Sequence, residues 1–246
     1  MSNPKVRINQ LSNIEWLDGS LCTYTISHSN HIWQINIPSN LKHINAISNL
    51  LTADEHERAN RYYREKDKQR FILARAILRL LLARYLNRDA KQLIFEIGEN
   101  KKPHVKGDTN LHYNVSHSGD YILIAISDSE VGVDVEQPDL NMHYEDIMDI
   151  SYSKPEADFV KASANPLQTF YLLWTRKEAL LKATAKGIDD ALKHIPGIDG
   201  THNTLHSTIG SEKDWIVQSF PIDNQHIGSI ASAYSENTFW EFKLLQ

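Results

Sequence analysis

The chain has 246 residues, a formal net charge of −5 and a single cysteine, Cys22. A hydrophobic content of 41% and a charged content of 23% are typical of a globular protein with a substantial core. A single cysteine excludes an internal disulfide and a thiolate zinc cluster. No stretch reaches the roughly 20 apolar residues of a membrane span, and none resembles a signal peptide. We therefore expect a cytoplasmic protein with no membrane association.

Positive charge is concentrated in the first half of the chain. Residues 56–88 contain ten Lys and Arg against three Asp and Glu, a local charge of +7, so the rest of the chain carries −12. This basic segment could contact phosphate groups, an acidic protein or only solvent. The net acidity argues against a nucleic-acid partner.

Residues 1–128 are expected to form an N-terminal half. Thr52 and Glu55 predict the capping box of a helix, and the apolar spacing after Arg70 predicts a second, amphipathic helix. Five segments have the alternation or the apolar run of a strand: residues 21–27, 32–37, 93–97, 111–118 and 121–126. His28 and His31 are expected in the turn between the first two strands.

Residues 129–246 are expected to form a C-terminal half, which opens with a strand. Valines at 131, 133 and 135 alternate with Gly132, Asp134 and Glu136, the pattern of a strand with one buried face. The two carboxylates then point to the same side, roughly 6.6 Å apart along the strand. The last strands are predicted at residues 215–220, 227–233 and 238–244, the final two as a hairpin.

A long helix is predicted to start at Asn165-Pro166, to include residues 174–183 and to end at Lys186-Gly187, where Gly187 suits a left-handed cap. Glu178 and Lys182 share one face of it, because residues four apart are neighbours on a helix. Two carboxylates on a strand and a Glu/Lys pair on a helix are each more often solvated surface than a site. Together they supply three carboxylates and one ammonium, a plausible cage for Mg²⁺ and a phosphate group.

A third motif runs from Asn114 to Ser118. Its hydroxyl and imidazole groups can donate hydrogen bonds to phosphate oxygens. Ser116 and His117 are not a nucleophile and its base, because adjacent residues on a strand point to opposite faces.

These three motifs, in this order, resemble those of the 4′-phosphopantetheinyl transferases of the surfactin-synthetase-activating type. The resemblance implies an α+β fold of two similar halves in a pseudo-twofold arrangement. Each half would be a small, mostly antiparallel sheet packed on a long helix, with the active site in the cleft between the halves. It also implies transfer of the phosphopantetheine arm of coenzyme A to a serine of an apo acyl carrier protein or peptidyl carrier domain, with release of 3′,5′-ADP, by an enzyme expected to be a monomer.

The resemblance assigns roles to residues of both halves. Asp134, Glu136 and Glu178 match the positions that hold Mg²⁺, or Mn²⁺ in its place, and Lys182 matches the lysine at the diphosphate. Asp134, Glu178 and Lys182 would be catalytic, with Glu178 or a metal-bound water as the base. The positions that match coenzyme A contacts are Arg58, Arg70, Lys102, Pro103, Ser116, His117 and Lys182.

The chain departs from some relatives at the segment expected to bind the 3′-phosphate, where Glu55 and Phe71 replace a lysine and a threonine. The interpretation leaves two roles open for Arg75, a phosphate contact or a flank of the core, and two for Lys177, a phosphate contact or none. Glu156 is expected to cap a helix or lie at the surface. The carrier-protein surface is not marked by any motif; residues 137–166 are one candidate for it.

Two other functions fit part of the pattern. A Mg²⁺-dependent phosphohydrolase or nuclease also uses clustered carboxylates with a lysine, and would show hydrolysis of a simple phosphodiester or salt-dependent DNA binding. A non-catalytic adaptor could bind carrier proteins through the basic segment, and would keep its function when Asp134 is replaced.

Overall fold

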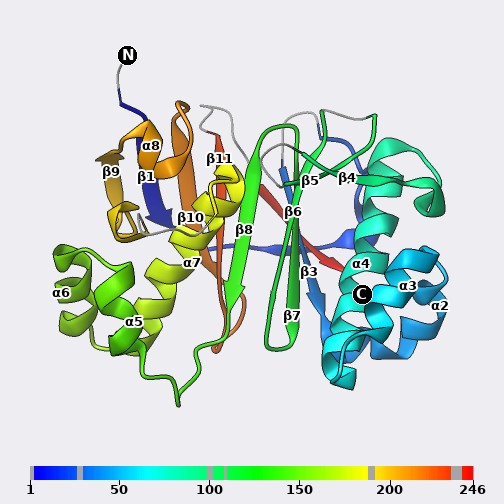
Figure 1. The fold of residues 1–246 in the computed structure, drawn as a ribbon, viewed down its shortest axis with the longest axis horizontal. Helices are drawn as coiled ribbons and strands as arrows, with labels where there is room; N and C mark the ends of the chain where they lie inside the picture. Colours follow the sequence, from blue (N-terminus) through cyan, green and yellow to red (C-terminus); the bar gives the residue numbers. More distant parts are fainter. Residues whose placement is uncertain are drawn as a thin grey trace.

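The computed structural model describes residues 3–26, 30–98, 102–107, 110–187, 192–233 and 240–245. Two α+β halves lie side by side, each with a five-stranded sheet and one long helix (Figure 1). The predicted fold class is confirmed. Within the described ranges, no helix is long and apolar enough to cross a membrane.

The sheet of the first half packs on helix α4. Its strands, in spatial order, are β2 (Trp16–Asp18), β12 (Trp240–Leu245), β3 (Asn30–Asn36), β7 (Tyr121–Ser127) and β6 (His112–Ser118). The helices are α1 (Ile37–Asn40), α2 (Ile44–Ser48), α3 (Ala53–Asn60) and α4 (Glu65–Leu86), and a small hairpin joins β4 (Phe95–Ile97) to β5 (Pro103–Val105). Leucines and isoleucines of α4 pack on Trp33 and on the isoleucines of β7 in one core.

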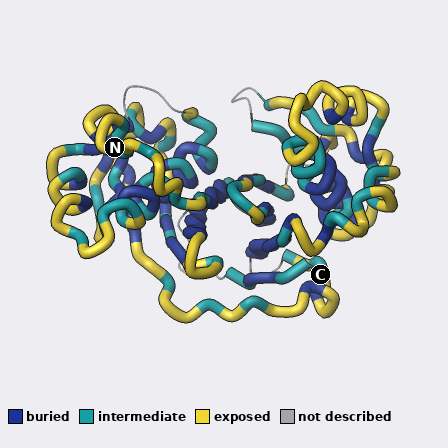
Figure 2. Tube along the Cα trace, turned by 90° about the horizontal axis from the view of Figure 1, so that it is seen from below, coloured by how far each residue is buried: buried dark blue, intermediate teal, exposed yellow. Residues whose placement is uncertain are grey.

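The sheet of the second half packs on helix α7. Its strands, in spatial order, are β8 (Val131–Glu136), β11 (Ile227–Ala233), β10 (Trp215–Pro221), β1 (Lys5–Gln10) and β9 (Gly200–Asn203). The helices are α5 (Tyr144–Ser151), α6 (Lys154–Ala162), α7 (Pro166–Thr184) and α8 (His206–Ile209). Residues of α7 pack on β1 and β10 in a second core, and a third cluster joins the two sheets. Figure 2 shows that buried backbone is continuous between the halves.

The two ends of the chain exchange places between the sheets. β1 lies in the sheet of the second half, parallel to β10, while β12 lies in the sheet of the first half, parallel to β3. Each terminal strand therefore completes the sheet of the half that lies farther from it along the chain.

Three sequence predictions in the terminal regions are wrong. The expected hairpin of the last two strands does not form, because β11 pairs with β10 and β8 whereas β12 pairs with β3 and β2. Residues 21–26 are not a strand, and Gly19–Leu21 is a short 3₁₀ turn instead. His31 lies in β3 and not in a turn; Ser27 and His28 lie outside the described residues.

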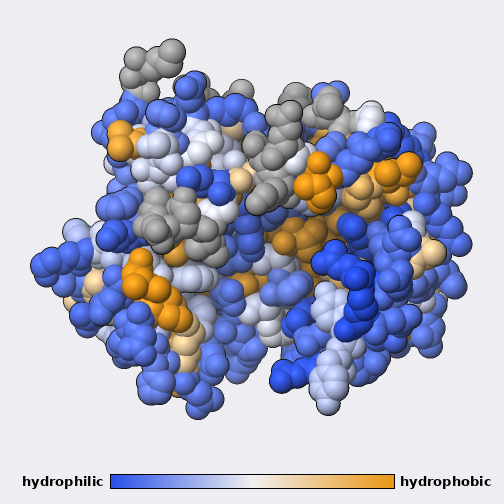
Figure 3. All heavy atoms as spheres, in the orientation of Figure 1, coloured by the Kyte–Doolittle hydropathy of each residue, from blue (hydrophilic) through white to orange (hydrophobic). Residues whose placement is uncertain are grey.

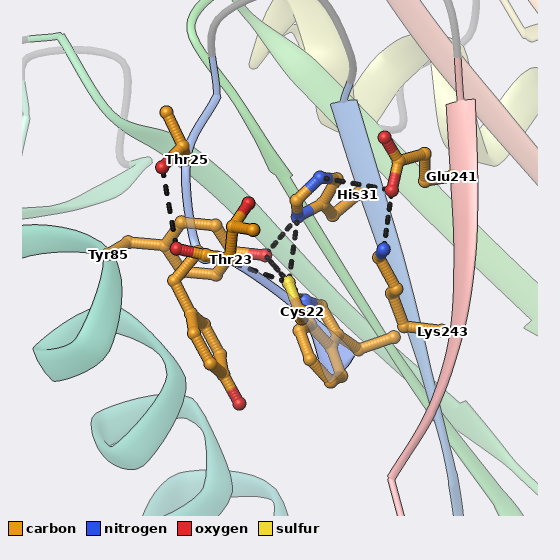
Figure 4. A network of polar contacts seen from close by, with 9 residues as sticks. Cys22, Thr23, Thr25, His31, Tyr85, Glu241 and Lys243 are labelled. Carbon is orange, nitrogen blue, oxygen red and sulfur yellow. Dashed lines mark hydrogen bonds and ion pairs between the residues drawn. The ribbon is translucent and has the colours of Figure 1, made fainter. Parts of the chain in front are cut away.

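Buried polar groups hold β3, β12 and the end of α4 together (Figure 4). Trp33 donates to Tyr85 Oη at 2.9 Å, so the Tyr85 hydroxyl hydrogen is free to bind His31 Nδ1. His31 Nε2 then faces Glu241 at 3.7 Å, and Glu241 is paired with Lys243. Burial, followed by the charge of Lys243, lowers the pKa of His31 to about 4, so this imidazole is neutral at pH 7.

Candidate active site

Two edge strands, β6 and β8, lie next to each other where the halves meet, and side chains rather than a backbone ladder connect them. Asn114 Oδ1 accepts from the Val133 amide at 2.9 Å, and the Ser116 hydroxyl donates to Asp134 Oδ1 at 2.8 Å. One step further, the Ser118 hydroxyl donates to Glu136 at 2.8 Å. Residues 114, 116 and 118 share a face of β6, so this motif is the seam that positions both carboxylates.

Helix α7 brings a cation to the same seam. Lys182 Nζ donates to Asp134 Oδ1 at 2.6 Å and to Ser116 Oγ at 3.1 Å. The close approach of α7 to β8 requires a glycine at position 132, where a Cβ would lie 2.1 Å from the Ala179 carbonyl oxygen. The Lys182 side chain remains 30% exposed. The molecular surface is hollowed between the two halves on the face drawn in Figure 3.

Burial opposes ionisation of all three carboxylates, and the charge of Asp134 adds to this effect at Glu136 and Glu178. Burial raises the pKa of Asp134, although Lys182 and Ser116 act in the opposite direction. Burial and then the charge of Asp134 raise the pKa of Glu136 to about 7. Burial and the charge of Asp134 also raise the pKa of Glu178. Negative charge at this site therefore exceeds the positive charge that Lys182 supplies.

No three His, Cys, Asp or Glu side chains of the described residues are already arranged around a common metal position. Lys182 lies against Asp134 Oδ1 instead. The other carboxylate oxygen, Asp134 Oδ2, is buried and has no hydrogen-bond partner among the described groups. An oxygen acceptor without a donor, beside two further carboxylates, is chemically suited to a hard divalent cation.

Basic groups of the first half flank the seam. Partial burial and the charge of Arg70 lower the pKa of His117. Arg70 pairs with Asp67 at 2.7 Å, and the guanidinium of Arg58 lies over the Phe71 ring, 5.1 Å from its centroid. These groups share the region in which the sequence predicted coenzyme A contacts.

Lys102 lies towards the opposite end of β6 from His117. Its ammonium donates to the Val131 carbonyl at 2.7 Å and to the Ala183 carbonyl at 3.2 Å, so it ties the first half to the start of β8 and the end of α7. Burial lowers the pKa of Lys102 to about 8. With Pro103, Lys102 lines a cavity of about 270 Å³ between the halves.

Lys177 is turned away from the site. It is fully buried, and its ammonium donates to Glu156 at 2.9 Å and to the carbonyls of Ser151 and Leu192. Of the two roles left open by the sequence, the phosphate contact is therefore wrong. Glu156 caps α6, as predicted, but it is buried and not a surface residue.

The sequence interpretation missed the roles of Asn114 and Ser118. Their alternation with Ser116 was the available signal, because it places three polar side chains on one strand face, opposite the carboxylates of residues 131–136. For Ser116 the structure adds a contact that the sequence did not predict, because this side chain is buried against Asp134; its contact with coenzyme A stays a prediction.

The sequences of both halves match known protein families. Residues 33–129 match the family described as "4′-phosphopantetheinyl transferase, N-terminal", and residues 130–231 match the 4′-phosphopantetheinyl transferase superfamily. The Synechocystis protein slr0495, which bears a 4′-phosphopantetheinyl transferase name, is 34% identical over 78% of this chain and 77% of its own length.

Two Bacillus subtilis proteins extend the comparison. A 4′-phosphopantetheinyl transferase is 29% identical over 76% of this chain and 84% of its own length. The transferase Sfp of strain 168 is 28% identical over 56% of this chain and 62% of its own length. The chain therefore belongs to the 4′-phosphopantetheinyl transferase superfamily, whose enzymes transfer phosphopantetheine from coenzyme A to carrier proteins.

Proposed function

We propose that this enzyme transfers the 4′-phosphopantetheine arm of coenzyme A to a serine hydroxyl of an apo carrier protein, requires Mg²⁺, and releases 3′,5′-ADP. The observation that carries the proposal is the environment of Asp134. Ser116 and Lys182 fix one of its oxygens, the other oxygen has no described partner, and Glu136 and Glu178 add charge beside it.

Asp134, Glu136 and Glu178 would hold the metal ion. Mg²⁺ prefers oxygen ligands and keeps several waters, so a few carboxylates suffice, and Mn²⁺ accepts the same ligands. When bound, the ion would neutralise charge on the diphosphate of coenzyme A.

The reaction needs positioning, charge neutralisation and one proton acceptor. The serine oxygen forms a bond to the phosphorus that carries the pantetheine arm, the phosphoanhydride bond breaks, and 3′,5′-ADP leaves. Lys182 is exposed enough to reach the diphosphate and would stabilise the charge that grows on the leaving phosphate. Glu178 would accept the serine proton, directly or through a water molecule, and its raised pKa suits a general base.

The basic groups of the first half would bind the other end of coenzyme A. Arg58, Arg70 and His117 supply two cations and an imidazole next to the seam. Ser116 and Lys102 would act mainly by holding Asp134 and the cleft walls, and Pro103, which lines the same cavity as Lys102, would contact the cofactor. Both halves lie on one chain, which supports a monomeric enzyme, and the single cysteine supports a reducing, cytoplasmic setting.

The proposal is tested by incubating the purified protein with coenzyme A, Mg²⁺ and apo carrier proteins of fatty-acid, polyketide and nonribosomal-peptide synthases. We expect at least one carrier to gain phosphopantetheine, with an equal amount of 3′,5′-ADP released. A chelator should stop the reaction and added Mg²⁺ should restore it. Transfer that continues in the chelator would contradict the metal requirement, and release of 3′,5′-ADP without carrier modification would indicate a hydrolase.

A further inference from the structure

One carboxylate in the first half is shared by two arginines of α4. Arg79 donates to Glu55 through Nε at 2.7 Å and through Nη2 at 3.0 Å, and Arg75 Nε lies 2.6 Å from the same carboxylate. Burial would raise the pKa of Glu55, but the hydrogen bonds from Arg79 and the Thr52 backbone, together with the charges of Arg75 and Arg79, more than offset it, and this pKa is lowered. Glu55 is therefore ionised, and the cluster of three side chains carries a net charge of +1.

The two arginines differ in how many of their guanidinium nitrogens already have a hydrogen-bond partner. Arg79 is buried, and its Nη1 donates to the carbonyls of Ala90 and Leu93. The Arg75 side chain is 23% exposed, and its guanidinium lies over the Phe95 ring, 4.2 Å from the centroid. Among the described residues no acidic partner other than Glu55 contacts Arg75. Its Nε and one ring-stacked face are fixed, and its terminal nitrogens remain available.

Arg75 also lies along the wall that carries the other basic groups. Phe71, one helical turn before Arg75, holds the Arg58 guanidinium against its ring. The Phe95 ring under Arg75 packs against Tyr113 with ring centroids 5.9 Å apart, and Tyr113 and His117 share one face of β6. Arg75 therefore extends the basic wall formed by Arg58, Arg70 and His117.

We propose that Arg75 is a specificity residue for the 3′-phosphate of coenzyme A and that Glu55 is the positioning residue that fixes its guanidinium. The inference rests on the proposed function, because it assumes that coenzyme A binds in this cleft. A planar guanidinium can donate two parallel hydrogen bonds to a phosphate, and holding it in place before binding reduces the entropy lost on binding. An acidic residue in a phosphate-binding segment is thereby explained: Arg79 neutralises Glu55, and Glu55 orients Arg75.

The test is calorimetric binding of adenosine 3′,5′-bisphosphate and adenosine 5′-monophosphate to the wild-type chain and to Arg75→Gln. Losing charge-assisted hydrogen bonds to the 3′-phosphate should weaken bisphosphate binding about tenfold or more. Binding of the monophosphate should not change. Arg84→Gln, on the last turn of the same helix and against Tyr24, is the matched control and should behave as wild type for both ligands.

Two further variants separate the charge from its orientation. Arg75→Lys keeps the positive charge but loses the two parallel hydrogen-bond donors of the guanidinium. It should bind the bisphosphate with an affinity between those of wild type and Arg75→Gln. Glu55→Gln should weaken bisphosphate binding selectively while Arg75 itself is intact. If Glu55→Gln does not fold, as judged by its melting curve, the Arg75 variants still decide the specificity role.

An equal loss for both nucleotides in Arg75→Gln, or no loss for either, would overturn the assignment. Failure of the proposed function gives a different result. A wild-type chain that prefers the bisphosphate but modifies no carrier protein would refute the transferase proposal and leave the role of Arg75 standing.

Discussion

The Ser116 hydroxyl donates to Asp134 Oδ1 across the seam between the two halves, at 2.8 Å. The serine belongs to the first half and the aspartate to the second, and Lys182 from α7 contacts both. Because side chains and not a backbone ladder join β6 to β8, the position of the carboxylates depends on the polar residues of the β6 motif. The site is therefore a property of the interface and belongs to neither half alone.

We expect Ser116→Ala to slow carrier modification by on the order of tenfold, because a hydrogen bond to an ionised group is lost and Asp134 can rotate. The melting temperature should change little, since the cavity left by one hydroxyl is small. Steady-state rates with saturating coenzyme A measure the effect. Ser48→Ala, which removes an exposed hydroxyl in α2, is the control; equal rates for both variants would show that the contact with Ser116 is not needed.

Gly132→Ala should damage both stability and activity. The added Cβ would meet the backbone of α7 at Ala179 and Ala183, which cannot move without shifting the whole helix away from β8. We expect a loss of roughly 1–3 kcal/mol in unfolding free energy, from denaturant titration, and slower transfer because Lys182 moves with α7. A variant with wild-type stability and rate would mean that α7 and β8 do not approach as closely as described.

Lys177 and Lys182 lie five residues apart on one helix, and their substitutions should have opposite effects. Lys177→Met leaves Glu156 buried without its cation and should destabilise the chain by about 3–5 kcal/mol. Lys182→Met should leave the melting temperature near that of wild type and lower kcat more than it changes KM, because the charge it stabilises grows in the transition state. If Lys182→Met lowered the stability and Lys177→Met lowered kcat instead, the structural and catalytic roles assigned to these two lysines would be wrong.

Acid should destabilise the fold through His31. The ordinary pKa of 6.5 is lowered to about 4 in the folded state, so the unfolded chain binds a proton on this residue first as the pH falls. The neutral imidazole thus contributes stability above about pH 6.5, and on the order of 3 kcal/mol is lost between that pH and about 4. Denaturant titrations at several pH values should show a shallower slope for His31→Gln; an unchanged slope would contradict the depressed pKa.

The motifs predicted β8 and α7 correctly, but they did not predict the orientation of Lys177 or the pairing of the terminal strands. The alternation at residues 131–136 and the four-residue spacing of Glu178 and Lys182 correctly predicted β8 and α7, because each pattern is local and sits on one long element. The capping box at Thr52 and Glu55 was also predicted correctly. The spacing of Lys177 beside Glu178 could not show its orientation, since a residue about 100° around a helix can face a core or a cleft.

Pairings between distant segments could not be read from the sequence. β1 and β12 each join the sheet of the other half, and the alternation of residues within a strand does not say which distant strand it will pair with. His31 was predicted in a turn, and its buried position in β3 could not be seen in the sequence. Its partners there, Tyr85 and Glu241, lie 54 and about 210 positions away along the chain. The shared use of Glu55 by two arginines likewise appears only when α3 packs on α4.

The most direct measurement is the intact mass of an apo carrier protein after incubation with coenzyme A, Mg²⁺ and either the wild-type enzyme or Asp134→Asn. The asparagine keeps the shape of the side chain but removes the charge that the proposed metal ion and Lys182 require. We predict that the wild-type enzyme converts the carrier to its phosphopantetheinylated mass, while Asp134→Asn folds normally and leaves the carrier unmodified. Conversion by Asp134→Asn at the wild-type rate would contradict the account.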